Sequence, residues 1–266
     1  MPTGTNPEEA KPASPSQPTR HVVSREEWLK RRVALLEKEK AFTRERDALS
    51  ALRRELPWVR VEKEYQFDGT RPGGARERVT LADLFEGRGQ LIVYHFMFDP
   101  AWSQGCQSCS LLADNYNPSP VHLAQRDTTL VTVSRAPIDK IDAFKKRMNW
   151  TFRWVSSHAS DFNRDFNVSH TQSEADAGLA RYNFVPITKP MSEMPGLSVF
   201  YRDSSGIYHT YSTYARGLDI LLNTYNLLDM TPKGRDEAPN EGMNWVRHHD
   251  RYNDPNFVYP WNEKRQ

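Results

Sequence analysis

The sequence predicts a mixed α/β fold, in which a central sheet is flanked by helices. Residues 91–98 have the length and the near-continuous hydrophobic character of a strand that is buried on both faces, and residues 128–134 are predicted to form a second buried strand. A segment of helical character follows each of them, and a hairpin comes later in the chain. This order predicts parallel strand–helix–strand pairing in the first half of the domain and antiparallel strands in the second.

Composition narrows the class of protein. The 266 residues include 36 Lys and Arg against 34 Asp and Glu, so a net charge of +2 offers no general attraction for nucleic acid or for an anionic membrane. No apolar run approaches the ~20 residues of a membrane-spanning helix. The N-terminus lacks the charged-then-apolar pattern of a secretion signal. We therefore expect a cytoplasmic protein that binds neither nucleic acid nor membrane.

The N-terminal part of the chain predicts a tail and a helical arm. Residues 1–20 are rich in Pro, Ser, Thr and Glu, and we expect them to be disordered. In the arm, residues 21–57, Ser24 and Glu27 have the spacing of a capping box, and Pro57 ends the helix. Apolar residues recur every seven positions: Trp28, Leu35, Phe42, Leu49 and Leu56. So narrow a stripe needs a partner surface, either on its own domain or on a second copy in a homodimer.

Residues 58–237 are predicted to form the α/β domain. The expected elements are a strand at 58–67, a turn at 68–74, a short helix at 79–85, the strand at 91–98, a helix at 110–116, the strand at 128–134, an amphipathic helix at 138–148, an extended piece at 152–155, a short helix at 161–166, a hairpin of 197–203 with 207–213, and a helix at 218–228. Residues 169–194, with several prolines, are expected to be an insertion or lid.

The C-terminal residues 238–266 have loop-like composition but carry many aromatic side chains: Trp245, Tyr252, Phe257, Tyr259 and Trp261. Large aromatic rings gain much free energy when they are buried. We therefore expect this tail to pack on the body of the domain.

The two cysteines of the chain, Cys106 and Cys109, lie three residues apart. A secreted disulfide scaffold would carry more, and a single pair cannot supply the four ligands of a cysteine zinc site. Cys106 follows Gly105 and a loop, so it is expected where a helix begins, and backbone N–H groups there favour a thiolate. Cys109 lies one turn further on the same face. The spacing predicts a redox dithiol in which Cys106 attacks and Cys109 resolves.

Other side chains have two interpretations each. His95, inside the strand at 91–98, is either a hydrogen-bonded core group or a neighbour of the dithiol. Trp102 either shields the reactive thiol or packs its own loop. Arg135 follows a strand end, where it either contacts a substrate or forms a salt bridge. Adjacent histidines such as His248 and His249 point apart, so we expect no metal site. The sequence contains no glycine-rich phosphate-binding loop, so we expect no cofactor.

Several segments between residues 22 and 237 resemble a bacterial family of uncharacterised, predicted dithiol-disulfide oxidoreductases within the thioredoxin and peroxiredoxin superfamily. They include Leu56-Pro-Trp-Val-Arg-Val-Glu-Lys, Gly105-Cys-Gln-Ser-Cys-Ser, Ser134-Arg-Ala-Pro and His209-Thr-Tyr-Ser-Thr-Tyr-Ala-Arg-Gly. The resemblance implies a thioredoxin-like fold, to which the sequence pattern adds a long N-terminal helical arm and an aromatic C-terminal tail. It also implies a protein or small-molecule disulfide or thiol as substrate, and a thiol reductant as partner.

The resemblance to thioredoxins places Pro195 where they carry a cis-proline. Gly196 stands here in place of the threonine that follows it, which leaves the cis state open.

The resemblance to peroxiredoxins is carried by Ser103, a hydroxyl three residues before Cys106. Peroxiredoxins usually carry a helper arginine before the late strand, but residues 191–197 of this chain contain none. Arg135 or Arg216 would have to take its place. The first alternative is therefore a thiol peroxidase, in which a sulfenic acid on Cys106 is resolved by Cys109. The second is a redox-inactive thioredoxin-fold binding or assembly protein.

Overall fold

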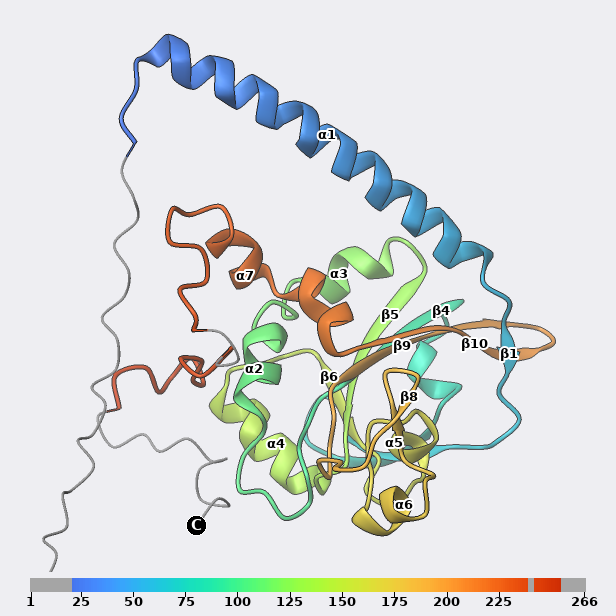
Figure 1. The fold of residues 1–266 in the computed structure, drawn as a ribbon. Helices are drawn as coiled ribbons and strands as arrows, with labels where there is room; N and C mark the ends of the chain where they lie inside the picture. The colour runs from blue at the N-terminus through green and yellow to red at the C-terminus, as the bar shows by residue number, and fades with distance from the viewer. Residues whose placement is uncertain (1–20, 239–241, 255–266) are drawn as a thin grey trace, which may run out of the picture.

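In a computed structural model, which describes residues 21–238 and 242–254, an eight-stranded sheet forms the centre of the molecule (Figure 1). Its strand order is β1-β10-β9-β4-β5-β6-β2-β3. The bounds are β1 Val59–Arg60, β2 Gln66–Thr70, β3 Arg76–Thr80, β4 Gln90–His95, β5 Thr128–Ser134, β6 Arg153–Ser156, β9 Gly196–Asp203 and β10 Gly206–Tyr214. The predictions for residues 1–20 and for Phe257, Tyr259 and Trp261 lie outside the described residues.

The centre of the sheet has the predicted mixture of directions. β4 runs parallel to β5, which runs parallel to β6, whereas β9 lies antiparallel to β4 and to β10. Parallel strands β6, β5 and β4 followed by the antiparallel hairpin form a thioredoxin-like sheet, to which the β2–β3 hairpin is added at one edge. The expected fold class is confirmed.

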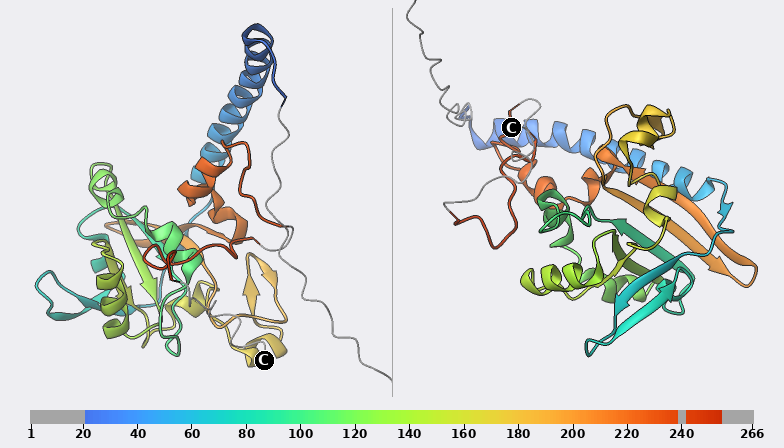
Figure 2. Two further views of the ribbon diagram at one scale, coloured as in Figure 1. Left: turned by 90° about the vertical axis from the view of Figure 1, so that its left-hand side faces the viewer. Right: turned by 90° about the horizontal axis from the view of Figure 1, so that it is seen from below.

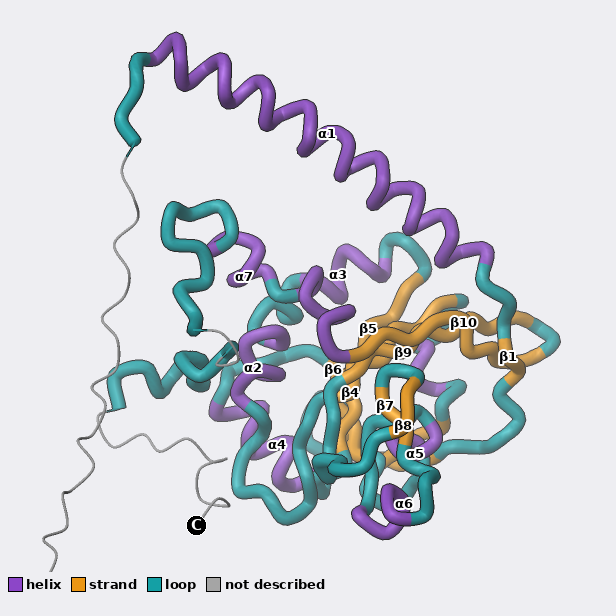
Figure 3. The backbone as a smooth tube through the Cα atoms, viewed as in Figure 1, coloured by secondary structure: helices purple, strands orange, loops and turns teal. Residues whose placement is uncertain are grey.

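Strand β4 contributes to two separate apolar cores because successive strand residues point to opposite faces. Tyr94, with Phe96 just beyond the strand, lies in a core on the side of α2 (Gln107–Ala113) and α4 (Ile138–Arg147). Leu91 and Val93 lie in the opposite core, which the short helix α5 (Phe162–Asp165) covers. Figure 3 shows helices on both sides of the sheet. Burial on both faces explains the continuous apolar run.

The predicted strand at 58–67 is wrong in part. The structure divides this region into β1, which pairs with β10 at one edge, and β2, which pairs with β3 near the other. Asp68 and Gly69, expected in a turn, belong to β2. The turn lies at Gly73 and Gly74, whose φ values of +96° and +93° are accessible mainly to glycine.

The other short elements are η1 (Asp83–Phe85), α3 (Ser119–Ala124), α6 (Gln172–Asp176), β7 (Arg181–Tyr182), β8 (Val185–Pro186), η2 (Ala215–Leu221) and α7 (Asn223–Leu228). The sequence predicted some of these elements with shifted ends, but it did not predict α3, nor the three elements within residues 169–194 (α6, β7 and β8). The expected single helix at 218–228 is two shorter ones, and α2 begins three residues before the expected helix at 110–116.

The N-terminal helix α1 (Arg25–Glu55) contains 31 residues, none of them buried, and it stands away from the sheet over most of its length (Figures 1 and 2). Ser24 caps it by accepting from the Glu27 N–H at 3.2 Å. The Glu27 carboxylate binds Arg31 and not the backbone N–H of Ser24, so only one of the two hydrogen bonds of the predicted capping box is present. Among residues 21–238 and 242–254, no helix is long and apolar enough to span a membrane.

Candidate active site

The loop after β4 delivers Cys106 to the start of α2. The Cys106 N–H donates to the Met97 carbonyl at 3.0 Å, and the residue is the N-cap of the helix. A side chain at the preceding Gly105 would place its Cβ 2.6 Å from the Phe96 ring and 2.9 Å from the Phe144 ring. Only glycine fits there without displacing an aromatic ring, so packing fixes how the chain enters the helix.

The two thiols have unequal environments. A hydrogen bond from the Cys109 side chain lowers the pKa of Cys106, and the backbone N–H groups of Cys109 and Ser108 add to this effect against the opposing effect of burial. For Cys109, burial raises the pKa well above its usual value, and the neighbouring Cys106 sulfur raises it further. The site therefore favours a thiolate on Cys106 and a protonated thiol on Cys109.

Both cysteines are free and buried, with 7% of Cys106 and 2% of Cys109 exposed. They belong to the apolar core that contains Tyr94 and Tyr116. A hydrogen bond between the Tyr94 side chain and Cys109 opposes the rise in the cysteine's pKa. The dithiol is thus built into the core and not displayed on a surface loop.

Gln107, between the two cysteines, is only 1% exposed, and neither its amide nitrogen nor its amide oxygen has a hydrogen-bond partner within the described part of the chain. An unsatisfied buried amide costs free energy, of order 1–3 kcal/mol. Such a group beside a reactive thiol can bind a small polar molecule that enters the site.

The C-terminal segment reaches the dithiol from far along the sequence. His248 is fully buried, and its Nε2 lies 2.9 Å from the Gly105 carbonyl oxygen. His249 turns the other way, with Nδ1 2.7 Å from Asp114. Within the described ranges, no group of three or more His, Cys, Asp or Glu side chains is placed to hold a metal ion.

The other predicted residues of the dithiol loop lie at the same end of the sheet. Trp102 is half-buried against the core of the two cysteines, and its carbonyl accepts from Lys140 at 3.1 Å. Ser103 is exposed. Pro195 comes directly before β9, whose Gly196 pairs with His95, and its peptide bond is trans.

His95 is not part of the dithiol site. Its Nε2 lies 2.9 Å from the Ser198 hydroxyl, and its ring stacks on Phe162 in the opposite core. Burial lowers the pKa of His95 to about 3. The structure favours the first of its two interpretations, a hydrogen-bonded core group.

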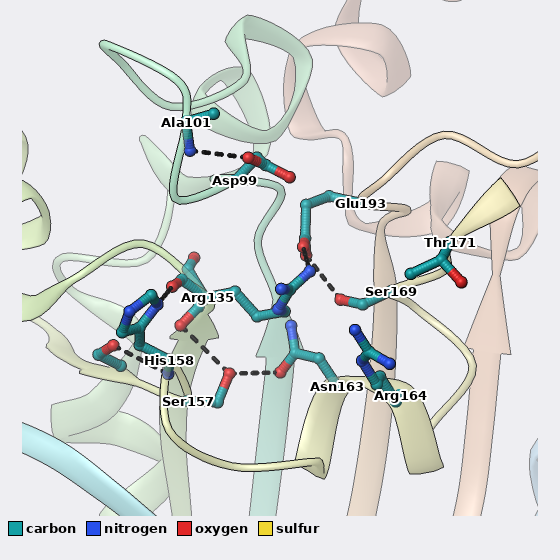
Figure 4. Close-up of polar contacts among 12 residues, drawn as sticks. Asp99, Ala101, Arg135, Ser157, His158, Asn163, Arg164, Ser169, Thr171 and Glu193 are labelled. Atoms are coloured by element: carbon teal, nitrogen blue, oxygen red, sulfur yellow. Dashed lines mark hydrogen bonds and ion pairs between the residues drawn. The ribbon is translucent and has the colours of Figure 1, made fainter. Parts of the chain in front are cut away.

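Arg135 also serves a different cluster, which Figure 4 shows. Its Nη1 lies 2.8 Å from a carboxylate oxygen of the buried Glu193, and the Ser169 hydroxyl donates to the other oxygen at 2.8 Å. Burial raises the pKa of Glu193 to about 7. This pair joins β5 to the base of the 169–194 segment. Arg216 is largely exposed and pairs with Asp219 at 3.3 Å.

Sequence reasoning missed several groups around the thiols: Tyr94, Gln107, Ser108, Arg147 and the contact of His248 with Gly105. Alternation along β4 assigns Tyr94 to one face but does not show that α2 covers that face. The sequence does not predict the contact of His248 with Gly105, because the two residues lie 143 positions apart.

Comparison with known proteins gives a family and a set of distant structures. The family model described as "Bacterial protein of unknown function (DUF899)" matches residues 17–252. None of the curated proteins compared with the chain matches it.

Similar solved structures include peroxiredoxins. AhpC of Enterococcus faecalis is 12% identical with a TM-score of 0.42, covering 65% of this chain and 93% of its own. Peroxidoxin BcpB of Mycobacterium tuberculosis is 13% identical with a TM-score of 0.40, covering 62% and 96%. A peroxiredoxin Q variant of Xanthomonas campestris is 14% identical with a TM-score of 0.39, covering 61% and 90%.

Proposed function

The chain belongs to the DUF899 family of bacterial proteins of unknown function, and from its own residues we propose that it is a dithiol–disulfide oxidoreductase. The observation that carries the proposal is the asymmetry of the pair. Cys106 has its pKa lowered by hydrogen bonds from Cys109 and from backbone N–H groups, whereas burial holds Cys109 protonated. An attacking thiolate with a resolving thiol one helical turn away is the arrangement that disulfide exchange requires.

The reaction consists of two exchanges. The Cys106 thiolate attacks one sulfur of a substrate disulfide, forms a mixed disulfide and releases the other sulfur as a thiolate that takes up a proton. Cys109 then loses its proton and attacks the Cys106 sulfur, which releases the second substrate thiol. The substrate disulfide gains two electrons and becomes two thiols, while the protein dithiol becomes a disulfide. A thiol reductant of the cell returns the pair to the reduced state.

A trapping experiment tests the assignment of the two roles. Without Cys109 the mixed disulfide has no resolving thiol and accumulates. Cys109→Ser protein mixed with a small disulfide is expected to carry one substrate equivalent on Cys106 by mass spectrometry. Cys106→Ser protein is expected to remain unmodified. Equal labelling of the two variants would contradict the assignment.

Thiol peroxidase is the second candidate, and the burial of Cys106 favours it because a hydroperoxide is small enough to reach a covered sulfur. The thiolate would attack the peroxide oxygen and leave a sulfenic acid, and the departing alkoxide would take up a proton. Cys109 would then attack the oxidised sulfur, which forms the disulfide and releases water. Rapid consumption of hydrogen peroxide by the reduced protein would distinguish this candidate.

We also propose that α1 joins a second copy of the chain. Trp28, Leu35, Phe42 and Leu49 are between 45% and 65% exposed on a helix without a buried residue. Basic and acidic residues alternate between Leu35 and Leu49, so two such helices can pair there without strong like-charge repulsion. A homodimer would cover the apolar stripe.

A further inference from the structure

The C-terminal segment, residues 242–254, lies against the start of α2 (Figures 1 and 2). Val246 is fully buried in the core that contains both cysteines, and Met243 packs against the same core. His248 reaches the carbonyl of Gly105, the residue directly before Cys106. The segment therefore lies over the point at which the chain enters the dithiol.

Besides the contact of His249 with Asp114, the guanidinium of Arg147 holds this segment. Arg147 of α4 donates from Nε and Nη2 to the two carboxylate oxygens of Asp250, both at 2.8 Å. Its Nη2 also lies 3.3 Å from His248 Nδ1. Since arginine can only donate, Nδ1 is the acceptor, and the ring proton of a neutral His248 sits on Nε2, from which it donates to the Gly105 carbonyl. The same guanidinium donates to Gln104 at 3.0 Å, so it holds the segment and the dithiol loop together.

The ion pair between Arg147 and Asp250 is partly exposed and can break. The Arg147 and Asp250 side chains are 26% and 33% exposed, and ion pairs at such positions are weakened by water and salt. The segment itself consists of turns without a helix or a strand. Segments with few backbone bonds open locally at a small fraction of the cost of global unfolding.

We infer that residues 242–254 are a cover that limits the closed dithiol to small electrophiles, such as low-mass disulfides or hydroperoxides. A folded protein's disulfide cannot bring its sulfur in line with a thiolate of which 7% is exposed, so the cover must lift before a protein substrate reacts. The substrate class rests on the proposed function, whereas the cover can be tested without it.

The test is alkylation of Cys106 in the full chain, in a Cys109→Ser background, by a small maleimide and by a maleimide carrying a long polyethylene glycol chain. Both rates are proportional to the fraction of Cys106 that is ionised, so their ratio is independent of the pKa and reports only how easily each reagent reaches the sulfur. Asp250→Asn keeps the shape of the side chain but removes the charge that Arg147 binds. His248→Ala removes the contact with Gly105. Asp176→Asn, an exposed carboxylate on α6, is the matched control.

We expect the ratio of bulky to small reagent to rise about tenfold in Asp250→Asn and in His248→Ala, the effect of losing about 1.4 kcal/mol from the closed state. The control should not change it. Exchange of the Val246 amide, which donates to Met243, should accelerate in both variants while the amides of β4 and β5 stay protected. An unchanged ratio in both variants overturns the cover. Because alkylation needs no redox turnover, an ordinary pKa for Cys106 would contradict the proposed function and leave this result standing.

Discussion

The Cys109 side chain, one helical turn beyond Cys106, hydrogen-bonds to the Cys106 sulfur and is the largest cause of the lowered pKa of Cys106. The two cysteines therefore do not act as equivalent thiols. The partner that later resolves the mixed disulfide is also the partner that prepares the nucleophile. This relationship connects the sequence spacing to the chemistry, because i and i+3 positions on a helix lie within reach of each other.

Removing the donor should weaken the nucleophile. In Cys109→Ala protein the hydrogen bond is lost and the pKa of Cys106 rises, so alkylation near neutral pH should slow about tenfold, the size of one hydrogen bond to a charged group. Cys109→Ser keeps a donor and is the matched control, which should lose much less. The measurement is the rate of iodoacetamide labelling across pH. Equal slowing in both variants would show that the donor has no special role.

Gly105→Ala should destabilise the fold by about 1–3 kcal/mol, because the new methyl group meets the rings of Phe96 and Phe144. Gly242→Ala is the control, since its nearest neighbour would be 3.4 Å away. Urea unfolding of the two variants gives the comparison. Equal urea midpoints for the two variants would mean that Phe96 and Phe144 can move aside without destabilising the fold.

His95 should make stability depend on pH. Burial lowers its folded pKa to about 3, below that of the unfolded chain, so the unfolded state binds more protons as the pH falls. The contribution is fully present above the unfolded pKa of about 6.5 and is lost toward the folded value, which amounts to about 2 kcal/mol between about pH 7 and pH 5.

His95→Gln removes this titration and keeps a hydrogen-bonding side chain opposite Ser198. Its free energy of unfolding should therefore decline less than the wild type over the same range. Since the other histidines are present in both proteins, the difference isolates His95. Parallel pH profiles would contradict the assignment.

Arg135 should prove structural. Arg135→Gln leaves Glu193 buried without its cation, which should cost about 3 kcal/mol at alkaline pH. Because Arg135 lowers the pKa of Glu193, its removal raises that pKa above the wild-type value of about 7, so the cost should decrease as the pH falls toward 7 and Glu193 takes up a proton. Combining Arg135→Gln with Glu193→Gln should recover most of the loss. A change in the labelling rate of Cys106, with stability unaltered, would instead assign Arg135 to the dithiol.

If α1 joins two copies of the chain, a charged residue in its apolar stripe should prevent dimer formation. Phe42→Lys in the middle of α1 should convert a dimer to a monomer in sedimentation equilibrium without unfolding the domain, because the side chain is 65% exposed in a single chain. Glu37→Lys, on the charged part of the same helix, is the control. A wild-type protein that is monomeric at all accessible concentrations would remove the proposal.

Apolar patterning predicted the parts of the fold that are buried on two faces. β4 lies in a continuous apolar run because α2 and α4 cover one side of it and α5 the other. In β5, Leu130 faces the first of these cores and Val131 and Val133 face the second. The division of residues 58–67 between two edges escaped prediction, since β1 pairs with β10 and β2 with β3, and pairing partners are set by tertiary structure.

The site was predictable to the same degree. Spacing alone indicated Cys106, Gly105 and Cys109, because they follow one another at a strand–loop–helix junction. The contacts of His248 with Arg147 and with Gly105 join residues that are 101 and 143 positions apart, so the local sequence cannot predict them. The structure confirms the salt-bridge interpretation of Arg135, but its partner Glu193, 58 positions away in the 169–194 segment, could not be named from the sequence.

The most direct test of the central claim is the titration of the wild-type pair, by pH-dependent alkylation of Cys106 together with equilibration in glutathione buffers. The account predicts that Cys106 is a thiolate well below the free-cysteine pKa of about 8.5, that Cys109 is protonated at the same pH, and that the pair closes reversibly to one intramolecular disulfide. Two thiols that titrate as ordinary cysteines, with no disulfide formed at any glutathione ratio, would contradict it and leave a thioredoxin-fold binding protein.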